Sequence, residues 1–236
     1  MTGVWQAISG AVTNTYIPTS AEIQVGQYLH VVASYVDDHG SAESVTSAAM
    51  MVMPPSQIAL SGLAGNSIGF RLDGASGSVE GYGSSVASAG DLDGDGVPDL
   101  IVGAPWGSSN TGAAYVLFGP QVTGGFSMSG ISSPNFFGSP VRSAGDINGD
   151  WVSDLIVGAV GAGGDAGAAY VVVGNPLLAS ASTIDLATLD GSTGFSLIDS
   201  TGGASAQLGC SVNSAGDING DGLDDLIVGS FGANSN

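Results

Sequence analysis

The sequence contains no lysine and only two arginines, against 21 aspartates and glutamates among its 236 residues. The formal net charge at pH 7 is −19. Nucleic acids and anionic membrane surfaces are bound through clusters of basic side chains. The composition therefore argues against both kinds of partner.

Long hydrophobic runs and helical periodicity are also missing. No apolar stretch reaches the roughly 18 residues that a membrane-spanning helix needs, and no signal peptide is visible after Met1. The single cysteine, Cys210, excludes an intramolecular disulfide. Hydrophobic residues make up 43% of the chain and occur in short bursts between many of the 40 glycines. This pattern predicts an all-β fold of short strands joined by turns.

One acidic nonapeptide occurs three times. It reads DLDGDGVPD at residues 91–99, DINGDWVSD at residues 146–154 and DINGDGLDD at residues 217–225, named here the first, second and third loops. Each copy follows Ser-Ala-Gly and precedes Leu-Ile-Val-Gly. Repetition in a fixed context indicates a repeat architecture.

The residue types in these loops suit a hard cation. Oxygen-bearing side chains stand at the first, third, fifth and ninth positions of each loop, and Ca²⁺ takes about six to eight oxygen ligands. The seventh residue is apolar and is expected to offer its backbone carbonyl. The loop is too short for an EF-hand, and a strand follows where a helix would begin. A solvated Asx-Gly turn is the alternative, but it does not need this many oxygens at fixed spacing.

The repeats divide the chain. Residues 56–236 are predicted to form about three four-stranded blades, the last incomplete, and each unit carries a Gly-Phe strand before its loop. Residues 1–53 lack these landmarks, and residues 54–55, two prolines, are a stiff linker. Within 1–53 we expect strands at residues 5–8, 15–17, 26–36 and 44–46, with a turn at residues 37–40. Both parts look like pieces of a longer protein.

The frame of residues 82–105 resembles the FG-GAP repeat, which forms the β-propeller of integrin α subunits and of many secreted bacterial proteins. Tyr82 and Gly83 stand at the FG pair, and residues 103–105 read GAP. The corresponding pairs in the later copies are Phe137-Gly138 and Leu208-Gly209. The resemblance implies a seven-bladed propeller with calcium in its hairpin loops, of which this chain would hold a part.

The resemblance also implies the ligands of two to three Ca²⁺ ions. They are Asp91, Asp93, Asp95, Val97 and Asp99; Asp146, Asn148, Asp150, Val152 and Asp154; and Asp217, Asn219, Asp221, Leu223 and Asp225. The sixth residue is glycine in the first and third loops but Trp151 in the second. If that position needs a positive φ, the bulky residue costs about 1–2 kcal/mol. The second loop is therefore expected to be the weakest site.

Residues 1–53 are similar to part of the Ig- or cadherin-like tandem repeats of large bacterial surface and type I-secreted proteins. The similarity lies in residues 5–11, 15–16, 25–29 and 34–40. It implies an incomplete Ig-like β-sandwich at the N-terminus.

No catalytic motif accompanies the loops: the sequence has no Gly-x-Ser-x-Gly and no His-Glu-x-x-His. We therefore expect no catalysis within this chain. The leading interpretation is a calcium-binding interaction module of a secreted or surface bacterial adhesin-like protein, whose partner is a protein or glycan on a cell or matrix surface. The alternative is an accessory propeller of a secreted enzyme such as a phospholipase or other hydrolase.

Overall fold

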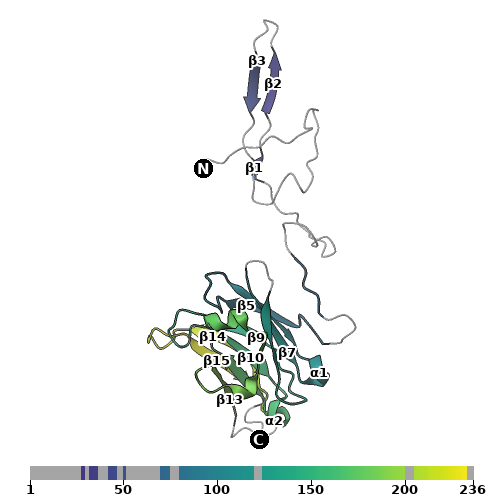
Figure 1. The fold of residues 1–236 in the computed structure, drawn as a ribbon, viewed down its shortest axis with the longest axis vertical. Coiled ribbons are helices and arrows are strands. Elements are labelled where there is room, and N and C mark those ends of the chain that lie inside the picture. The colour runs from purple at the N-terminus through teal and green to yellow at the C-terminus, as the bar shows by residue number, and fades with distance from the viewer. Residues whose placement is uncertain are drawn as a thin grey trace. The chain divides into compact units, whose positions relative to one another are not determined.

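The computed structural model describes residues 28–29, 32–36, 42–46, 50–51, 70–74, 80–119, 124–199 and 205–232. The chain separates into two compact units, Met1–Leu72 and Asp73–Asn236 (Figure 1). Within the described residues, no helix is both long enough and apolar enough to cross a membrane.

The first unit contains two antiparallel strand pairs. Its strands are β1 (Tyr28–Leu29), β2 (Val32–Val36), β3 (Ala42–Thr46) and β4 (Met50–Met51), with β1 paired to β4 and β2 to β3. β1 and β2 both lie within residues 26–36, where a single strand was expected, and β3 overlaps the strand expected at residues 44–46. β4 was not expected. The expected strands at residues 5–8 and 15–17 lie outside the described residues, as does the turn at residues 37–40. The Ig-like sandwich stays a prediction.

The second unit is built from three antiparallel blades, consistent with part of a β-propeller. Blade 1 contains β5 (Ser85–Gly90), β6 (Asp99–Ala104), β7 (Ala113–Leu117) and β8 (Gly125–Ser129). Blade 2 contains β9 (Val141–Gly145), β10 (Asp154–Ala159), β11 (Ala168–Val172) and β13 (Gly194–Ile198). Blade 3 has β14 (Leu208–Gly216) and β15 (Asp225–Ser230) within the described residues. Neighbouring strands within each blade are antiparallel and follow one another in the chain, except that residues 173–193, which contain two short helices and a short strand, intervene between β11 and β13. The predicted all-β fold is confirmed.

The Gly-Phe strands occupy a different place from the one expected. The sequence order suggested that Gly125 and Phe126 begin the second repeat, but they lie in β8, the fourth strand of blade 1. Gly194 and Phe195 likewise lie in β13, the fourth strand of blade 2. Sequence repeats alone do not fix where one blade ends and the next begins, because any cyclic shift of the frame gives the same period.

The second strand is most buried in blade 2, which packs against blade 1 on one face and blade 3 on the other. Every residue of β10 is buried, whereas β15 is mostly half-buried. Ile101 and Val141 share one hydrophobic cluster with Leu155, which joins blades 1 and 2. Ile156 and Val212 share a second cluster, which joins blades 2 and 3. The Leu-Ile-Val run therefore supplies side chains to both faces of its sheet.

Glycines allow the blades to approach closely. A Cβ on Gly103, in β6, would lie 1.8 Å from the carbonyl oxygen of Gly138 in the next blade. A Cβ on Gly158, in β10, would lie 2.2 Å from the carbonyl oxygen of Gly209. The two glycines of the repeated motif thus meet across each blade interface, where no side chain fits.

The longer spacer between the second and third loops folds back onto blade 1. It contains the short helices η2 (Pro176–Ser180) and η3 (Leu186–Thr188) and the strand β12 (Thr183–Ile184). Strand β12 pairs in parallel with β8, and Leu178 and Leu186 are buried in the same cluster as Phe126. The extra residues therefore tie blade 2 to blade 1.

Candidate metal centre

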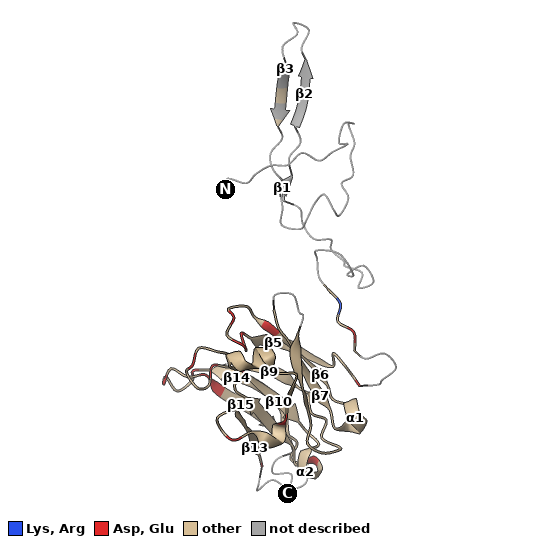
Figure 2. Cartoon of the chain, viewed as in Figure 1, with Lys and Arg blue, Asp and Glu red and all other residues tan. Residues whose placement is uncertain are grey.

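Each acidic loop connects the first two strands of its blade. The first loop joins β5 to β6, the second joins β9 to β10, and the third joins β14 to β15. Acidic residues mark these loops in Figure 2. The prediction that the repeated nonapeptides lie in β-hairpins is confirmed.

A β-bulge starts each loop and explains the repeated Ser-Ala-Gly. The strand register shifts at the glycine, which has a φ of 75°, 77° or 67° and accepts no side chain without strain. The glycine N–H donates to the hydroxyl of the serine two residues earlier in all three copies. The pairs are Gly90 with Ser88 at 3.2 Å, Gly145 with Ser143 at 3.2 Å and Gly216 with Ser214 at 3.1 Å.

The sixth residue of every loop has a left-handed backbone. Its φ is 88° at Gly96, 69° at Trp151 and 91° at Gly222. Trp151 thus adopts a conformation that costs a bulky residue about 1–2 kcal/mol, and its side chain is 92% exposed. The condition on which the expected strain depended, a positive φ at this position, is met, and the indole is too exposed for burial to offset the strain.

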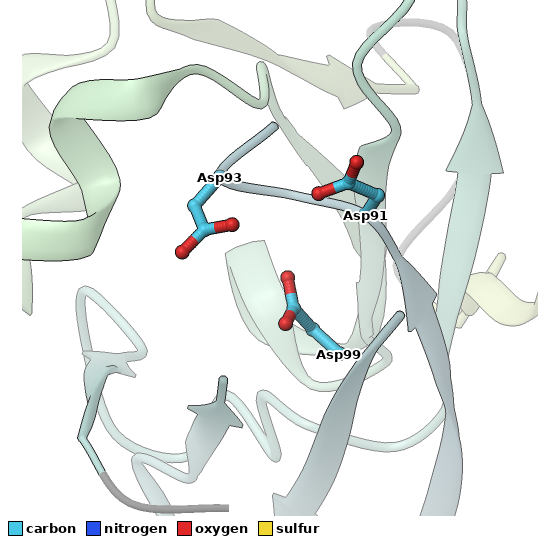
Figure 3. A group of neighbouring side chains, drawn as sticks. All are labelled: Asp91, Asp93 and Asp99. Carbon is cyan, nitrogen blue, oxygen red and sulfur yellow. The ribbon is translucent and has the colours of Figure 1, made fainter. Parts of the chain in front are cut away.

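The first loop brings three carboxylates together. Oxygens of Asp91, Asp93 and Asp99 all lie within 4.8 Å of one another, and Figure 3 shows the three groups pointing toward a shared space. Asp93 is 9% exposed and Asp99 is 1% exposed. Among the described residues, this is the one group of three or more acidic, histidine or cysteine side chains with that geometry.

One oxygen of this group is an unsatisfied acceptor. Asp91 Oδ1 is buried and has no hydrogen-bond partner, whereas Asp91 Oδ2 accepts from the Gly96 N–H at 2.9 Å. A buried carboxylate oxygen without a partner loses its hydration at a cost of at least about 1–3 kcal/mol. A hard cation among the three carboxylates would supply the missing partner. The first loop therefore fits the ion that its composition implies.

In the second and third loops, backbone N–H groups of the loop itself donate to the oxygen that corresponds to Asp91 Oδ1. Asp146 Oδ1 accepts from the N–H groups of Gly149 at 2.7 Å and Asp150 at 3.2 Å. Asp217 Oδ1 accepts from Gly220 at 2.6 Å and Asp221 at 3.1 Å. A cation that used these oxygens would compete with two amide hydrogen bonds. Sequence reasoning did not foresee this difference, because the first residue is aspartate in all three loops.

The ninth residue is held by amides from two places. Asp99 accepts from Leu92 within the loop at 2.9 Å and from Gly119, just beyond β7, at 3.0 Å. Asp154 accepts from Ile147 at 2.9 Å and from Gly174, just beyond β11, at 2.8 Å. Gly119 and Gly174 were missed by the sequence reasoning. The available signal was a glycine at the same distance after the ninth aspartate in both repeats.

The third loop satisfies its ninth residue differently. Asp225 Oδ2 accepts from the Ile218 N–H at 2.8 Å, as in the other loops. Its Oδ1 accepts from the Asn219 side-chain amide at 3.2 Å. Asn219 thus uses its amide group within the loop, and its own Oδ1 accepts from the Asp221 N–H at 2.8 Å.

Burial changes the proton affinity of the ninth residue. Burial raises the pKa of Asp154 to about 6, and the nearby Asp150 and Asp146 carboxylates add to the effect. Burial also raises the pKa of Asp99, with smaller contributions from Asp93 and Asp91. A bound cation would reverse this penalty by favouring the ionised form.

The pKa of Asp217, the first residue of the third loop, shifts in the opposite direction. Backbone hydrogen bonds, the Gly222 N–H first among them, hold the pKa of the Asp217 carboxyl below its usual range. The three loops therefore share a backbone shape but differ in the hydrogen bonds and in the pKa shifts of their carboxylates.

Comparison with known proteins supports the repeat. Residues 82–117 and 211–236 match the FG-GAP repeat. The chain is 39% identical to integrin alpha-5 of Xenopus laevis over 89 residues, which cover 34% of this chain and 8% of that protein. It is 35% identical to human integrin alpha-11 over 162 residues, 64% of this chain and 12% of the relative. It is 32% identical to human integrin alpha-IIb over 166 residues, 65% of this chain and 15% of the relative.

These findings support an FG-GAP repeat region similar to that of integrin alpha subunits. The matched segments include the first and third loops. The chain spans 8–15% of the length of these three relatives. The predicted Ig- or cadherin-like resemblance of residues 1–53 stays a prediction.

Proposed function

We propose that the second unit is a calcium-stabilised interaction module of an extracellular adhesion protein. The observation that carries the proposal is the first loop, where three carboxylates converge and the buried Asp91 Oδ1 lacks a partner. Calcium bound there would neutralise the acidic hairpin and fix its shape. The blades would then present their loops to a ligand as a rigid scaffold.

The proposed ligands follow the repeated positions of the loops. The first set is Asp91, Asp93, Asp95, Asp99 and the Val97 carbonyl, and the later loops offer the corresponding residues. Calcium in a site of this kind supplies charge neutralisation and cross-linking of the hairpin. The acidic surface, at a net charge of −19, is compatible with a protein or glycan partner rather than a nucleic acid.

The adhesive part of the proposal rests on similarity to integrin alpha subunits and on the absence of catalytic motifs in the sequence. A secreted or surface location follows from it, because extracellular calcium modules operate at about 10⁻⁴–10⁻³ M Ca²⁺. A bacterial source remains part of the proposal only through the resemblance of residues 1–53.

Calorimetric titration of the chelated protein with Ca²⁺ tests the metal sites. We expect more than one ion per chain and a much weaker response to Mg²⁺, which demands a tighter octahedron. Asp91→Asn with Asp93→Asn should remove the strongest phase. Asp185→Asn is the matched control, since asparagine can also cap η3 and Asp185 lies outside the loops. Unchanged heats in the double variant contradict the assignment.

Binding to arrayed matrix proteins and glycans tests the adhesive role separately. We expect retention on at least one class of surface in calcium and its loss on chelation. Retention on none of them contradicts the adhesive role while leaving the calcium sites intact. Retention that is insensitive to chelation contradicts the proposed link between calcium and binding.

A further inference from the structure

Asp224 links the third loop to the second. It is the eighth residue of the third loop and is not among the proposed ligands. Its carboxylate Oδ2 accepts from the N–H of Asp146, the first residue of the second loop, at 2.9 Å. Its own N–H donates to the Asp146 carbonyl at 2.9 Å. One residue of blade 3 thus holds both backbone groups of a proposed ligand in blade 2.

The second blade is shaped for this contact. A Cβ on Gly145 would lie 2.0 Å from Asp224 Oδ2, so the bulge glycine leaves room for the carboxylate. Gly149 of the second loop also faces the Leu223 side chain, since a Cβ there would lie 2.9 Å from it. The third loop therefore packs directly on both ends of the turn that carries Asp146.

The preceding junction has only part of this arrangement. Ser153, the eighth residue of the second loop, donates its N–H to the Asp91 carbonyl at 2.9 Å. Its side chain is a hydroxyl that lies over Gly90, where a Cβ would be 2.2 Å from Ser153 Oγ. Pro98, at the eighth position of the first loop, has no N–H to donate. The carboxylate contact is thus specific to the junction between blades 2 and 3.

We propose that Asp224 is a positioning residue for the second cation site, through which calcium in the third loop strengthens calcium binding in the second. The inference rests on the proposed calcium sites. Asp224 is adjacent in sequence to Asp225, a proposed ligand of the third loop. An ion that fixes Asp225 also restricts Asp224, and Asp146 is then ordered before its own ion arrives. By linkage, calcium in the second loop strengthens the third loop by the same factor.

Residue-resolved amide NMR during a calcium titration of the chelated protein tests the inference, because it follows each loop separately. Asp224→Ala removes the carboxylate, and Asp224→Asn keeps an acceptor oxygen without the charge. We expect Asp224→Ala to weaken calcium binding by the second loop by about tenfold, the scale of one intramolecular hydrogen bond. Asp224→Asn should recover most of that loss.

Two outcomes overturn the proposal. Unchanged second-loop affinity in Asp224→Ala shows that the contact does not position the site. Equal losses in the alanine and asparagine variants show that the negative charge acts through the field and not through the hydrogen bond. A protein in which no loop responds to calcium refutes the proposed function itself, which is a different result.

Hydrogen exchange of the Asp146 amide supplies a readout without calcium. In the ion-free protein this N–H should exchange faster in Asp224→Ala than in the parent or in Asp224→Asn. Exchange that is equally slow in all three proteins contradicts the positioning role. An unchanged melting midpoint of the ion-free Asp224→Ala protein establishes that the faster exchange is local.

The coupling is tested by disabling the third loop with Asp217→Asn and Asp221→Asn. We expect calcium binding in the second loop to weaken by up to about tenfold. Adding Asp224→Ala to this variant should then cause a smaller loss than Asp224→Ala causes alone. Full additivity of the two changes contradicts coupling through Asp224. Asp91→Asn with Asp95→Asn, which changes the same two positions of the first loop, is the matched control, and it should affect the second loop less.

Discussion

The first and second loops have the same backbone shape but different carboxylate arrangements. In the first loop, three carboxylates converge and Asp91 Oδ1 is buried without a partner. In the second, Asp146 Oδ1 is occupied by two amides, and Trp151 adopts a left-handed backbone. The same motif thus yields two kinds of site. In an open site, here the first loop, Oδ1 of the first residue has no hydrogen-bond partner; in a closed site, here the second loop, loop amides already occupy that oxygen. The difference predicts that the first loop binds calcium more firmly.

The largest expected effect is the loss of the first site. Asp91→Asn with Asp93→Asn should abolish the stabilisation that saturating calcium gives through this loop, about 2.7 kcal/mol at 100 times Kd. Thermal unfolding with and without calcium measures it. Asp146→Asn with Asp150→Asn, the first and fifth positions of the second loop, whose third position is already Asn148, should reduce the stabilisation less. Equal losses at the two loops would remove the distinction between an open and a closed site.

The next largest effect should be weaker calcium binding by the second loop at acidic pH. Because burial raises the pKa of Asp154 to about 6, protons compete with calcium below that pH. We expect about tenfold weaker binding near pH 5 than at neutral pH. The pKa of Asp217 is lowered, so its protonation should not weaken the third loop in this range. Titrations at the two pH values measure this. A pH-independent second loop contradicts the raised pKa.

The same pKa predicts how ion-free stability changes with pH. Folding raises the pKa of Asp154, so the folded protein binds this proton more tightly than the unfolded chain does. The contribution of Asp154 to the unfolding free energy should therefore increase as the pH falls from above about 6 toward 3.8, the ordinary pKa of an aspartate. Denaturant unfolding of the chelated protein measures it. Asp154→Asn should remove this component, and a curve that the variant leaves unchanged argues against it.

Relieving the backbone strain at Trp151 should tighten calcium binding by the second loop by up to about tenfold, since about 1.4 kcal/mol corresponds to that factor. Trp151→Gly tests this in a calcium titration. Trp151→Ala is the matched control, because it removes the indole but keeps a Cβ in the left-handed region. If alanine tightens the site as much as glycine does, the indole and not the backbone weakens the loop.

The bulge serines should have the smallest effect, and the same effect in both blades. Ser88→Ala and Ser143→Ala each remove the hydrogen bond that the bulge glycine N–H donates to the hydroxyl, worth about 0.5–1.5 kcal/mol. Each also removes a longer bond, of 3.5 or 3.4 Å, from the hydroxyl to the carbonyl of the ninth loop residue. Denaturant unfolding of the ion-free protein measures the loss. A much larger loss in blade 2 would place the difference between the loops in the bulge rather than in the carboxylates.

The sequence predicted the features that depend on local pattern. The short apolar runs predicted strands, the repeated nonapeptide predicted hairpin loops, and the glycines at the sixth position predicted the left-handed backbone that Trp151 also adopts. These properties follow from residue type and spacing. They needed no knowledge of which segments meet in space.

Features that depend on contacts between distant segments were not predicted. The amides of Gly119 and Gly174, just beyond the third strands, reach the loops. The spacer at residues 176–189 crosses to blade 1, and the Gly-Phe strands belong to the preceding blade. Asp146 Oδ1 accepts two loop amides whereas Asp91 Oδ1 has no partner, a difference that the shared residue type does not reveal.

The most direct test is a calcium titration of the chelated protein followed by the backbone amide resonances of the three loops. We predict that residues 91–99 shift and saturate first, that residues 146–154 respond at higher calcium, and that magnesium reproduces neither response. Saturation of the second loop before the first would contradict the distinction between the open and closed sites. No response in any loop would refute the calcium sites altogether.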